Sequence, residues 1–105
     1  MKILLVCAAG MSTSLVVNKM KKALGPDEQD WIIEANPAER FSSIFKNYDV
    51  ILLGPQIRFK KDEFEKMASE YDIPVGIINS VDYGLTNGEK ILNFAKELYK
   101  NKNKN

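Results

Sequence analysis

The sequence predicts an α/β fold in which a four-stranded parallel open sheet, with strand order 2-1-3-4, carries helices on both faces. Four short apolar runs alternate with segments whose apolar residues recur at helical spacing. This alternation is typical of a parallel sheet with right-handed crossovers. The runs are Ile3–Val6, Trp31–Ala35, Val50–Leu53 and Val75–Ile78. The first and third are the most uniformly apolar, so we expect them at the centre and Trp31–Ala35 at an edge.

Composition limits the classes of function. The chain has 105 residues, 45% of them hydrophobic and 28% charged, as in an ordinary globular domain. Fifteen basic and fourteen acidic residues nearly balance, so the chain lacks the excess of positive charge that is typical of nucleic-acid-binding proteins. One cysteine and no histidine exclude an internal disulfide, a zinc site and a Cys–His catalytic pair within the chain. We expect no metal and no cofactor, and a reducing, cytoplasmic setting.

The first element, Ile3–Val6, is predicted to be a buried strand. Its position after Met1-Lys2 superficially resembles a secretory signal, but it is shorter than the ~7–15 apolar residues of a signal's hydrophobic region. No apolar run approaches the ~20 residues of a membrane helix. A helix is expected next, with one apolar face, and Gly25-Pro26 should end it. The residues of that face are Val16, Val17, Met20, Ala23 and Leu24.

The second helix is expected to begin with a capping box. Asn36 would be the cap, Pro37 the first helical residue and Glu39 the third residue beyond the cap. The buried face of this helix would then consist of Phe41, Ile44 and Phe45.

The third helix is expected to bury Phe64, Met67, Ala68 and Tyr71. A second capping box, Thr86 to Glu89, should begin the last helix. Its expected buried residues are Ile91, Phe94, Ala95 and Leu98. The single domain is predicted to span residues 1–100, and residues 101–105, with nothing to bury, to form a frayed tail.

Cys7 is the candidate reactive residue because it follows the first strand directly. In open parallel sheets, ligands bind beyond the carboxyl ends of the strands. The loop Ala8–Ser14 precedes a helix, whose N-terminus binds anions and stabilises a thiolate. Small residues there would let the backbone approach an anion, and hydroxyl groups could donate hydrogen bonds. A nucleophilic thiolate that accepts a phosphoryl group would suit this loop, and a buried structural cysteine remains the alternative.

Three stretches of the chain resemble one known family. They are "CAAGMSTSLVVNKM" from Cys7, "DVILLGPQIRF" from Asp49 to Phe59, and "INSVDYGLTNG" from Ile78 to Gly88. Together they resemble the IIB component of the bacterial sugar phosphotransferase system, of the lactose/cellobiose/chitobiose type and most of all its cellobiose-type members. The resemblance covers nearly the whole chain, and the family's fold is a four-stranded parallel sheet with helices on both sides.

The resemblance implies a phosphoryl relay without a cofactor. A phosphohistidine on the partner IIA would phosphorylate Cys7, and the phosphocysteine would pass the group to a sugar. That sugar, typically a β-linked disaccharide such as cellobiose or chitobiose, would be bound by the membrane permease IIC. The protein would thus be cytoplasmic and peripheral to the membrane through IIC. The residues of the implied phosphate-binding loop are Ala8, Ala9, Gly10, Met11, Ser12, Thr13 and Ser14.

A hydrolase is the main alternative function. Low-molecular-weight tyrosine phosphatases and arsenate reductases place a cysteine at the same point of a similar fold, in the pattern C-x-x-x-x-x-R. Here Thr13 stands where that arginine would be, so no guanidinium would clamp the phosphate from this position. An Asp-Pro acid loop is also missing, because Ile73 separates Asp72 from Pro74. These departures favour a carrier.

Two non-enzymatic classes fit less well. A response-regulator receiver needs acidic residues where Cys7, Ala8 and Gly54 stand. A flavodoxin-like flavin site could use Ser12, Thr13 and Ser14 for phosphate and Tyr83 for stacking, but such residues are common.

Several residues could form a rim around the site. Gln56 follows the third strand, so it could border the phosphate loop or belong to a tight turn. Tyr83 and Gly84 could close the site from the other side. The charges of Arg58, Lys60 and Lys61 could attract an acidic partner, although solvated charges at a helix start are the favoured interpretation. Trp31 is expected to pack rather than to bind sugar.

Overall fold

The sheet agrees with the predicted fold class. The computed structural model describes residues 1–8 and 13–102. Its strands are β1 (Lys2–Cys7), β2 (Ile32–Pro37), β3 (Val50–Leu53) and β4 (Val75–Ile77). All neighbouring strands pair in parallel, in the order β2-β1-β3-β4, which confirms the predicted order.

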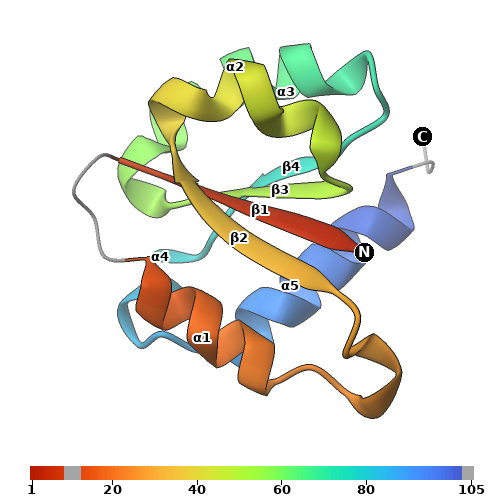
Figure 1. Ribbon diagram of the computed structural model, residues 1–105. Coiled ribbons are helices and arrows are strands. Elements are labelled where there is room, and N and C mark those ends of the chain that lie inside the picture. The colour runs from red at the N-terminus through yellow and green to blue at the C-terminus, as the bar shows by residue number, and fades with distance from the viewer. Residues whose placement is uncertain (9–12, 103–105) are drawn as a thin grey trace.

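Helices cover both faces of the sheet, as predicted. They are α1 (Ser14–Lys22), α2 (Phe41–Ile44), α3 (Lys61–Ser69), α4 (Ser80–Gly84) and α5 (Gly88–Asn101). Figure 1 shows α1 and α5 below the sheet and α2 and α3 above it. Short 3₁₀ segments lie at residues 26–28, 38–40, 45–47 and 55–60. Within the described residues, no helix has the length and apolar character needed to cross a membrane.

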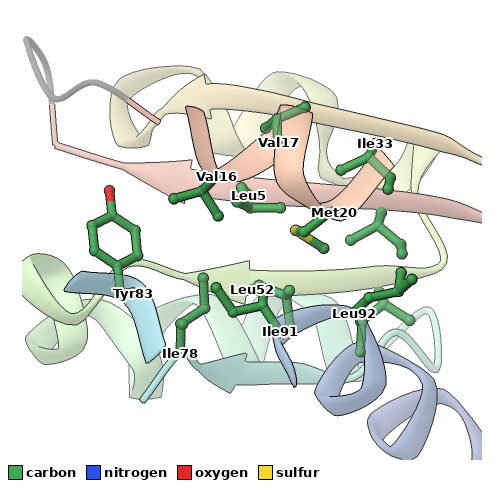
Figure 2. Close-up of a cluster of buried hydrophobic side chains, with 13 residues drawn as sticks. Leu5, Val16, Val17, Met20, Ile33, Leu52, Ile78, Tyr83, Ile91 and Leu92 are labelled. Carbon is green, nitrogen blue, oxygen red and sulfur yellow. The ribbon is translucent and has the colours of Figure 1, made fainter. Parts of the chain in front are cut away.

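The two central strands bury side chains on both faces, which explains why their sequences are continuously apolar. In β1, Ile3 and Leu5 face the α1 and α5 side, whereas Leu4 and Val6 face the α2 and α3 side. The α1 and α5 side also contains Val16, Val17, Met20, Ile33, Val50, Leu52, Ile78, Tyr83, Ile91, Leu92 and Ala95. Figure 2 shows this cluster, with Leu5 and Leu52 between the helices and the sheet. The opposite side is rich in aromatic rings, and those of Phe41 and Phe64 stack with centroids 3.8 Å apart.

The capping box expected at Asn36 is wrong. Asn36 and Pro37 are the last residues of β2, where they pair with Val6 and Cys7 of β1. Pro37 has an extended backbone, with φ −70° and ψ 157°, and helical turns begin only after it. The ladder with β1 therefore extends beyond the expected end of the strand. An edge strand tolerates proline because its outer side needs no N–H donor.

The second expected capping box is also wrong. Thr86 has a left-handed backbone, with φ 49°, and lies in the turn between α4 and α5. Asn87 caps α5 instead, and its Oδ1 accepts a hydrogen bond from the Lys90 N–H at 3.2 Å. Tyr71 does not share the buried face of α3, because α3 ends at Ser69 and Tyr71 is exposed. The short helix α4 was not predicted, and α5 extends to Asn101.

Candidate active site

The site lies at the carboxyl edge of the sheet, where several connections begin. Cys7 is the last residue of β1, and α1 begins at Ser14. The 3₁₀ segment Pro55–Lys60 follows β3, and α4 follows β4. In Figure 1 the end of β1, the start of α1, this segment and α4 gather at one edge of the molecule. Parallel strands place all these connections at the same edge, so residues distant in sequence surround Cys7.

The Cys7 thiol is buried between the start of α1 and the end of β2. Its Sγ lies 3.5 Å from Thr13 Oγ1, and either atom could donate the hydrogen bond. The thiol also donates to the carbonyl oxygen of Asn36 at 3.8 Å, the long distance typical of sulfur. Both Cys7 and Thr13 are only 6% exposed. The sulfur is thus held in a defined position, one residue beyond the hydrophobic part of β1.

The start of α1 favours negative charge near Cys7. The first turn of α1 contains no acidic residue, and its last turn contains Lys19, Lys21 and Lys22. This distribution complements the helix dipole, and the free N–H groups of the first turn remain available to an anion. Of the expected phosphate loop, Ala8 is half-buried, Thr13 is buried and Ser14 is exposed. Ala9, Gly10, Met11 and Ser12 lie outside the described residues.

The turn after β3 packs directly against the end of β1. Gly54 N–H donates to the Val6 carbonyl oxygen at 2.9 Å. A Cβ added to Gly54 would lie 2.9 Å from Gln56 Oε1, which shows that the Gln56 side chain folds back over this glycine. Gln56 is otherwise exposed. The structure therefore places the Gln56 amide beside the strand end that carries Cys7, within a tight turn.

The basic residues expected near the rim have local partners. Lys60 Nζ lies 3.7 Å from Glu63 Oε1, and Lys61 Nζ lies 3.4 Å from Glu65 Oε2. These are i,i+3 and i,i+4 pairs at the start of α3, which fits solvated charges at a helix start. Arg58 is exposed.

Tyr83 lies beneath the site, in the core cluster on the α1 and α5 side. Its side chain is buried, and among the described residues its Oη is the buried side-chain N or O atom without a hydrogen-bond partner. Burial raises the pKa of Tyr83, and negative charge on Cys7 raises it further. The neighbouring Gly84 is exposed.

Two features of the site could not be read from the sequence. Asn36 was expected to cap a helix, but its carbonyl oxygen accepts from the Cys7 thiol. The register of β2 against β1 creates this contact, and no local motif encodes it. The sequence indicated Tyr83 as a rim residue, but not that its hydroxyl would be buried without a partner among the described residues. Trp31 is half-buried against the core cluster, with Lys96 Nζ 5.5 Å from its ring centroid, so it packs as expected.

The described residues contain no group suited to metal binding. Across residues 1–8 and 13–102, no three His, Cys, Asp or Glu side chains lie close enough together to hold a metal ion.

Comparison with known proteins identifies the family. Residues 2–94 match the sequence model of a protein family that is described as the lactose/cellobiose-specific IIB subunit of the PTS system. Two proteins of Lactococcus lactis, named as the galactose-specific and cellobiose-specific EIIB components, are each 41% identical over 101 residues. Each alignment covers 91% of this chain and 94% of the relative.

A solved structure agrees with this assignment. The cellobiose-specific IIB component of Borrelia burgdorferi is 44% identical and superposes with a TM-score of 0.78. The superposition covers 97% of this chain and 94% of that one. Components of this type transfer phosphate to sugar, which confirms the predicted class of activity and the resemblance on which it rested. The chain therefore belongs to the lactose/cellobiose-specific IIB subunit family of the sugar phosphotransferase system.

Proposed function

We propose that Cys7 is the residue through which this IIB component carries the phosphoryl group. The Cys7 thiolate attacks the phosphorus of a phosphohistidine on IIA. An S–P bond forms while the N–P bond breaks, and the imidazole leaves. A sugar hydroxyl bound on IIC then attacks the phosphorus, the S–P bond breaks and the thiolate is released. The hydroxyl proton passes to solvent or to a base of the permease.

One observation carries this proposal: the only thiol of the chain ends β1, held by Thr13 at the start of α1. Phosphoryl transfer depends mainly on positioning and on stabilisation of charge. The first turn of α1 supplies N–H donors and the positive end of a dipole. Ala8, Thr13 and Ser14, together with residues 9–12, would hold the phosphoryl group, and Gln56 and Tyr83 would border it.

Carrier chemistry is favoured over hydrolysis by the residue at position 13. Position 13 holds a threonine, whose hydroxyl lies 3.5 Å from the Cys7 sulfur. It does not hold an arginine, which would stabilise the phosphoryl group during transfer. A hydrolase also needs a group that activates water against the phosphoenzyme. The described partners of Cys7 Sγ are a hydroxyl and a backbone carbonyl, and neither is a base at neutral pH.

Four exposed apolar side chains form the surface on which we expect the partners to dock. Leu15, Phe59, Val81 and Leu85, here named the apolar rim, are between 51% and 75% exposed. They lie at the start of α1, in the segment after β3, in α4 and directly after α4. All these segments begin at the edge of the sheet that carries Cys7 (Figure 1). Exposed apolar residues around one site indicate a surface for protein association.

Both partners must reach the same sulfur, so IIA and IIC would use this rim in turn. We place the protein at the cytoplasmic side, peripheral to the membrane through IIC. The expected sugar is a β-linked disaccharide such as cellobiose or chitobiose. Two relatives with different sugars in their names are equally similar to this chain, which supports a specificity determined by IIC.

The site assignment is tested by phosphorylation. The wild-type chain, incubated with the general phosphotransferase enzymes, a matching IIA and phosphoenolpyruvate, should gain one phosphoryl group on the peptide that contains Cys7. Cys7→Ser is the matched variant, because it replaces only sulfur by oxygen, and it should remain unlabelled. Phosphorylation at another residue, or full labelling of Cys7→Ser, would contradict the proposal.

The docking surface is tested separately. Phe59→Ala and Leu85→Ala should slow phosphorylation by IIA at limiting IIA concentration but not at saturation, since they remove contact area and no reacting group. Ile32→Ala is the matched control, because Ile32 is also exposed, at 41%, but begins β2 at the opposite edge of the sheet. Equal effects at both edges would show that the apolar rim is not the docking surface.

A further inference from the structure

The Tyr83 hydroxyl is buried and has no hydrogen-bond partner among the described residues, although the Tyr83 backbone is held by two hydrogen bonds. Tyr83 is 9% exposed, and among the described residues its Oη has no hydrogen-bond partner. Its N–H donates to the Asn79 carbonyl oxygen at 2.9 Å, and its own carbonyl oxygen accepts from the Thr86 N–H at 3.1 Å. Buried polar groups are normally paired, so a buried hydroxyl without a partner among the described residues suggests a partner outside them, such as a bound group.

The ring directs this hydroxyl toward the end of β1. Figure 2 shows Tyr83 standing at the border of the core cluster, with its oxygen turned away from the other side chains and toward the end of that strand. Gly54 gives a second measure of this position. A Cβ on Gly54 would lie 3.8 Å from Tyr83 Cε2 and 3.6 Å from the carbonyl oxygen of Val6. The edge of the ring and the residue before Cys7 therefore meet at the same glycine.

The hydroxyl is available as a donor at neutral pH. Burial raises the pKa of Tyr83, and negative charge on the Cys7 sulfur raises it further. The phenol thus keeps its proton while an anionic group occupies the site. A hydroxyl that donates to an anionic oxygen forms a shorter and stronger hydrogen bond than one between neutral groups.

We propose that Tyr83 Oη donates a hydrogen bond to a phosphoryl oxygen carried by Cys7. The inference rests on the proposed function, because it requires phosphocysteine at this position. Without the phosphoryl group, the hydroxyl has no partner among residues 1–8 and 13–102. The phosphoryl group supplies three acceptor oxygens at the end of β1. Tyr83 thereby favours acceptance of the phosphoryl group and contributes a side chain from α4 to a site whose other residues come from β1, the start of α1 and the turn after β3.

Tyr83→Phe tests this role because it removes only the oxygen. The variant should unfold at the same urea concentration as the wild type or a higher one, since the lost hydroxyl has no partner in the described part of the chain. The equilibrium constant for phosphoryl transfer from phosphorylated IIA should fall about tenfold, the effect of losing one hydrogen bond to a charged group. Phosphorylation should also raise the melting temperature of the wild type more than that of Tyr83→Phe.

Tyr48→Phe is the matched control. Tyr48 is also a buried tyrosine, but its hydroxyl already donates to Glu34 Oε1 at 2.6 Å. This variant should lose stability and accept the phosphoryl group as the wild type does. Tyr83→Phe should therefore reduce phosphoryl acceptance without loss of stability, whereas Tyr48→Phe should reduce stability without loss of phosphoryl acceptance. A merely structural role for Tyr83 would not produce this difference.

The outcomes separate this inference from the proposed function. Should Tyr83→Phe accept the phosphoryl group as readily as the wild type, the hydrogen bond does not exist, although Cys7 would remain the carrier. Failure of the wild type to become phosphorylated on Cys7 would instead refute the proposed function.

A second measurement uses the wild type alone. In ¹³C-tyrosine-labelled protein, phosphorylation should shift the NMR resonance of Tyr83 Cζ more than that of Tyr48 Cζ. Equal shifts would also overturn the inference.

Discussion

Cys7 Sγ and Thr13 Oγ1 lie 3.5 Å apart, and both side chains are buried. The contact joins the last residue of β1 to the residue that precedes α1. It also brings a hydroxyl to the sulfur at the position where cysteine phosphatases of similar fold carry an arginine. The two residues thus define where the proposed nucleophile, Cys7, lies and which kind of side chain accompanies it.

We expect Thr13→Val to slow acceptance of the phosphoryl group by Cys7 about tenfold, because it removes one hydrogen bond to a charged group and leaves the shape of the side chain nearly unchanged. Thr13→Ser retains the hydroxyl and should restore most of the rate. Single-turnover phosphorylation by labelled IIA measures both variants. A valine variant as fast as the wild type would show that the Cys7–Thr13 contact is only structural.

Phospho-Cys7 should persist in the isolated protein. Neither described partner of Cys7 Sγ can activate water at neutral pH, so hydrolysis should be slow while the site still binds the group. Release of inorganic phosphate from the purified phosphoprotein measures this directly. Persistence over many minutes, followed by rapid discharge on addition of IIC-containing membranes and a β-linked disaccharide, is the expected result. Loss within seconds, or turnover of an aryl phosphate, would support a hydrolase.

Gly88→Ala should destabilise the fold by about 3 kcal/mol, the upper range for an overpacked core. A Cβ at this first residue of α5 would lie 2.3 Å from the Lys19 carbonyl carbon and 2.6 Å from the Met20 nitrogen. Both atoms belong to the backbone of α1, so the two helices would have to separate. Urea unfolding measures the loss.

Gly84→Ala is the control for this glycine prediction. A Cβ at Gly84 would meet nothing within 4 Å, and the residue lies in α4. Alanine is the better helix former there, so stability should remain unchanged or rise by up to about 1 kcal/mol. A similar loss of stability in both variants would show that the close approach of α1 and α5 is not the cause.

Lys96→Met should reduce stability at neutral pH but have little effect in acid. Lys96 Nζ lies 2.6 Å from Glu28 Oε2, and Gly25 N–H donates to Glu28 Oε1 at 2.8 Å. The hydrogen bond from Lys96, and then that from Gly25, lowers the pKa of Glu28 below its ordinary value of 4.5. A lowered pKa contributes stability above the unfolded-state pKa, and that contribution disappears as pH falls through the folded-state pKa.

The measurement for Lys96→Met is urea unfolding of the wild type and the variant across a series of pH values. The difference between them should be constant from neutral pH down to about pH 5 and then shrink in more acidic solution. Methionine retains an unbranched apolar side chain, so contact with Trp31 is largely preserved. A difference independent of pH would attribute the effect to packing rather than to the Glu28 carboxylate.

Much of the fold could be predicted because β1 and β3 lie between two layers of helices. Each must bury both faces, so Ile3–Val6 and Val50–Leu53 are continuously apolar and recognisable without any partner. The alternation of such runs with helical spacing then limits the topology to a few choices. The resemblance in the Cys7 loop, in Asp49–Phe59 and in Ile78–Gly88 predicted the family.

Element boundaries could not be predicted as well, because competing interactions determine them. Asn36-Pro37 carries the pattern of a helix start, but pairing with β1 extends β2 through both residues. Thr86 carries the pattern of a cap, but the chain turns there with a positive φ and Asn87 caps α5 instead. At Asn36 a capping preference worth about 1 kcal/mol lost to pairing with a strand distant in sequence, and at Thr86 it lost to the local turn that connects α4 to α5.

The sequence by itself determined the class of fold, the position of Cys7 at the end of a central strand and the absence of an arginine at position 13. Each of these depends on residue type and spacing along one stretch of chain. Only the tertiary structure decided that the Asn36 carbonyl accepts from the Cys7 thiol and that the Tyr83 hydroxyl is buried with no partner among the residues that the structure describes. These relationships join β1 to β2 and α4, and the packing of separate elements on one sheet, rather than any local motif, creates them.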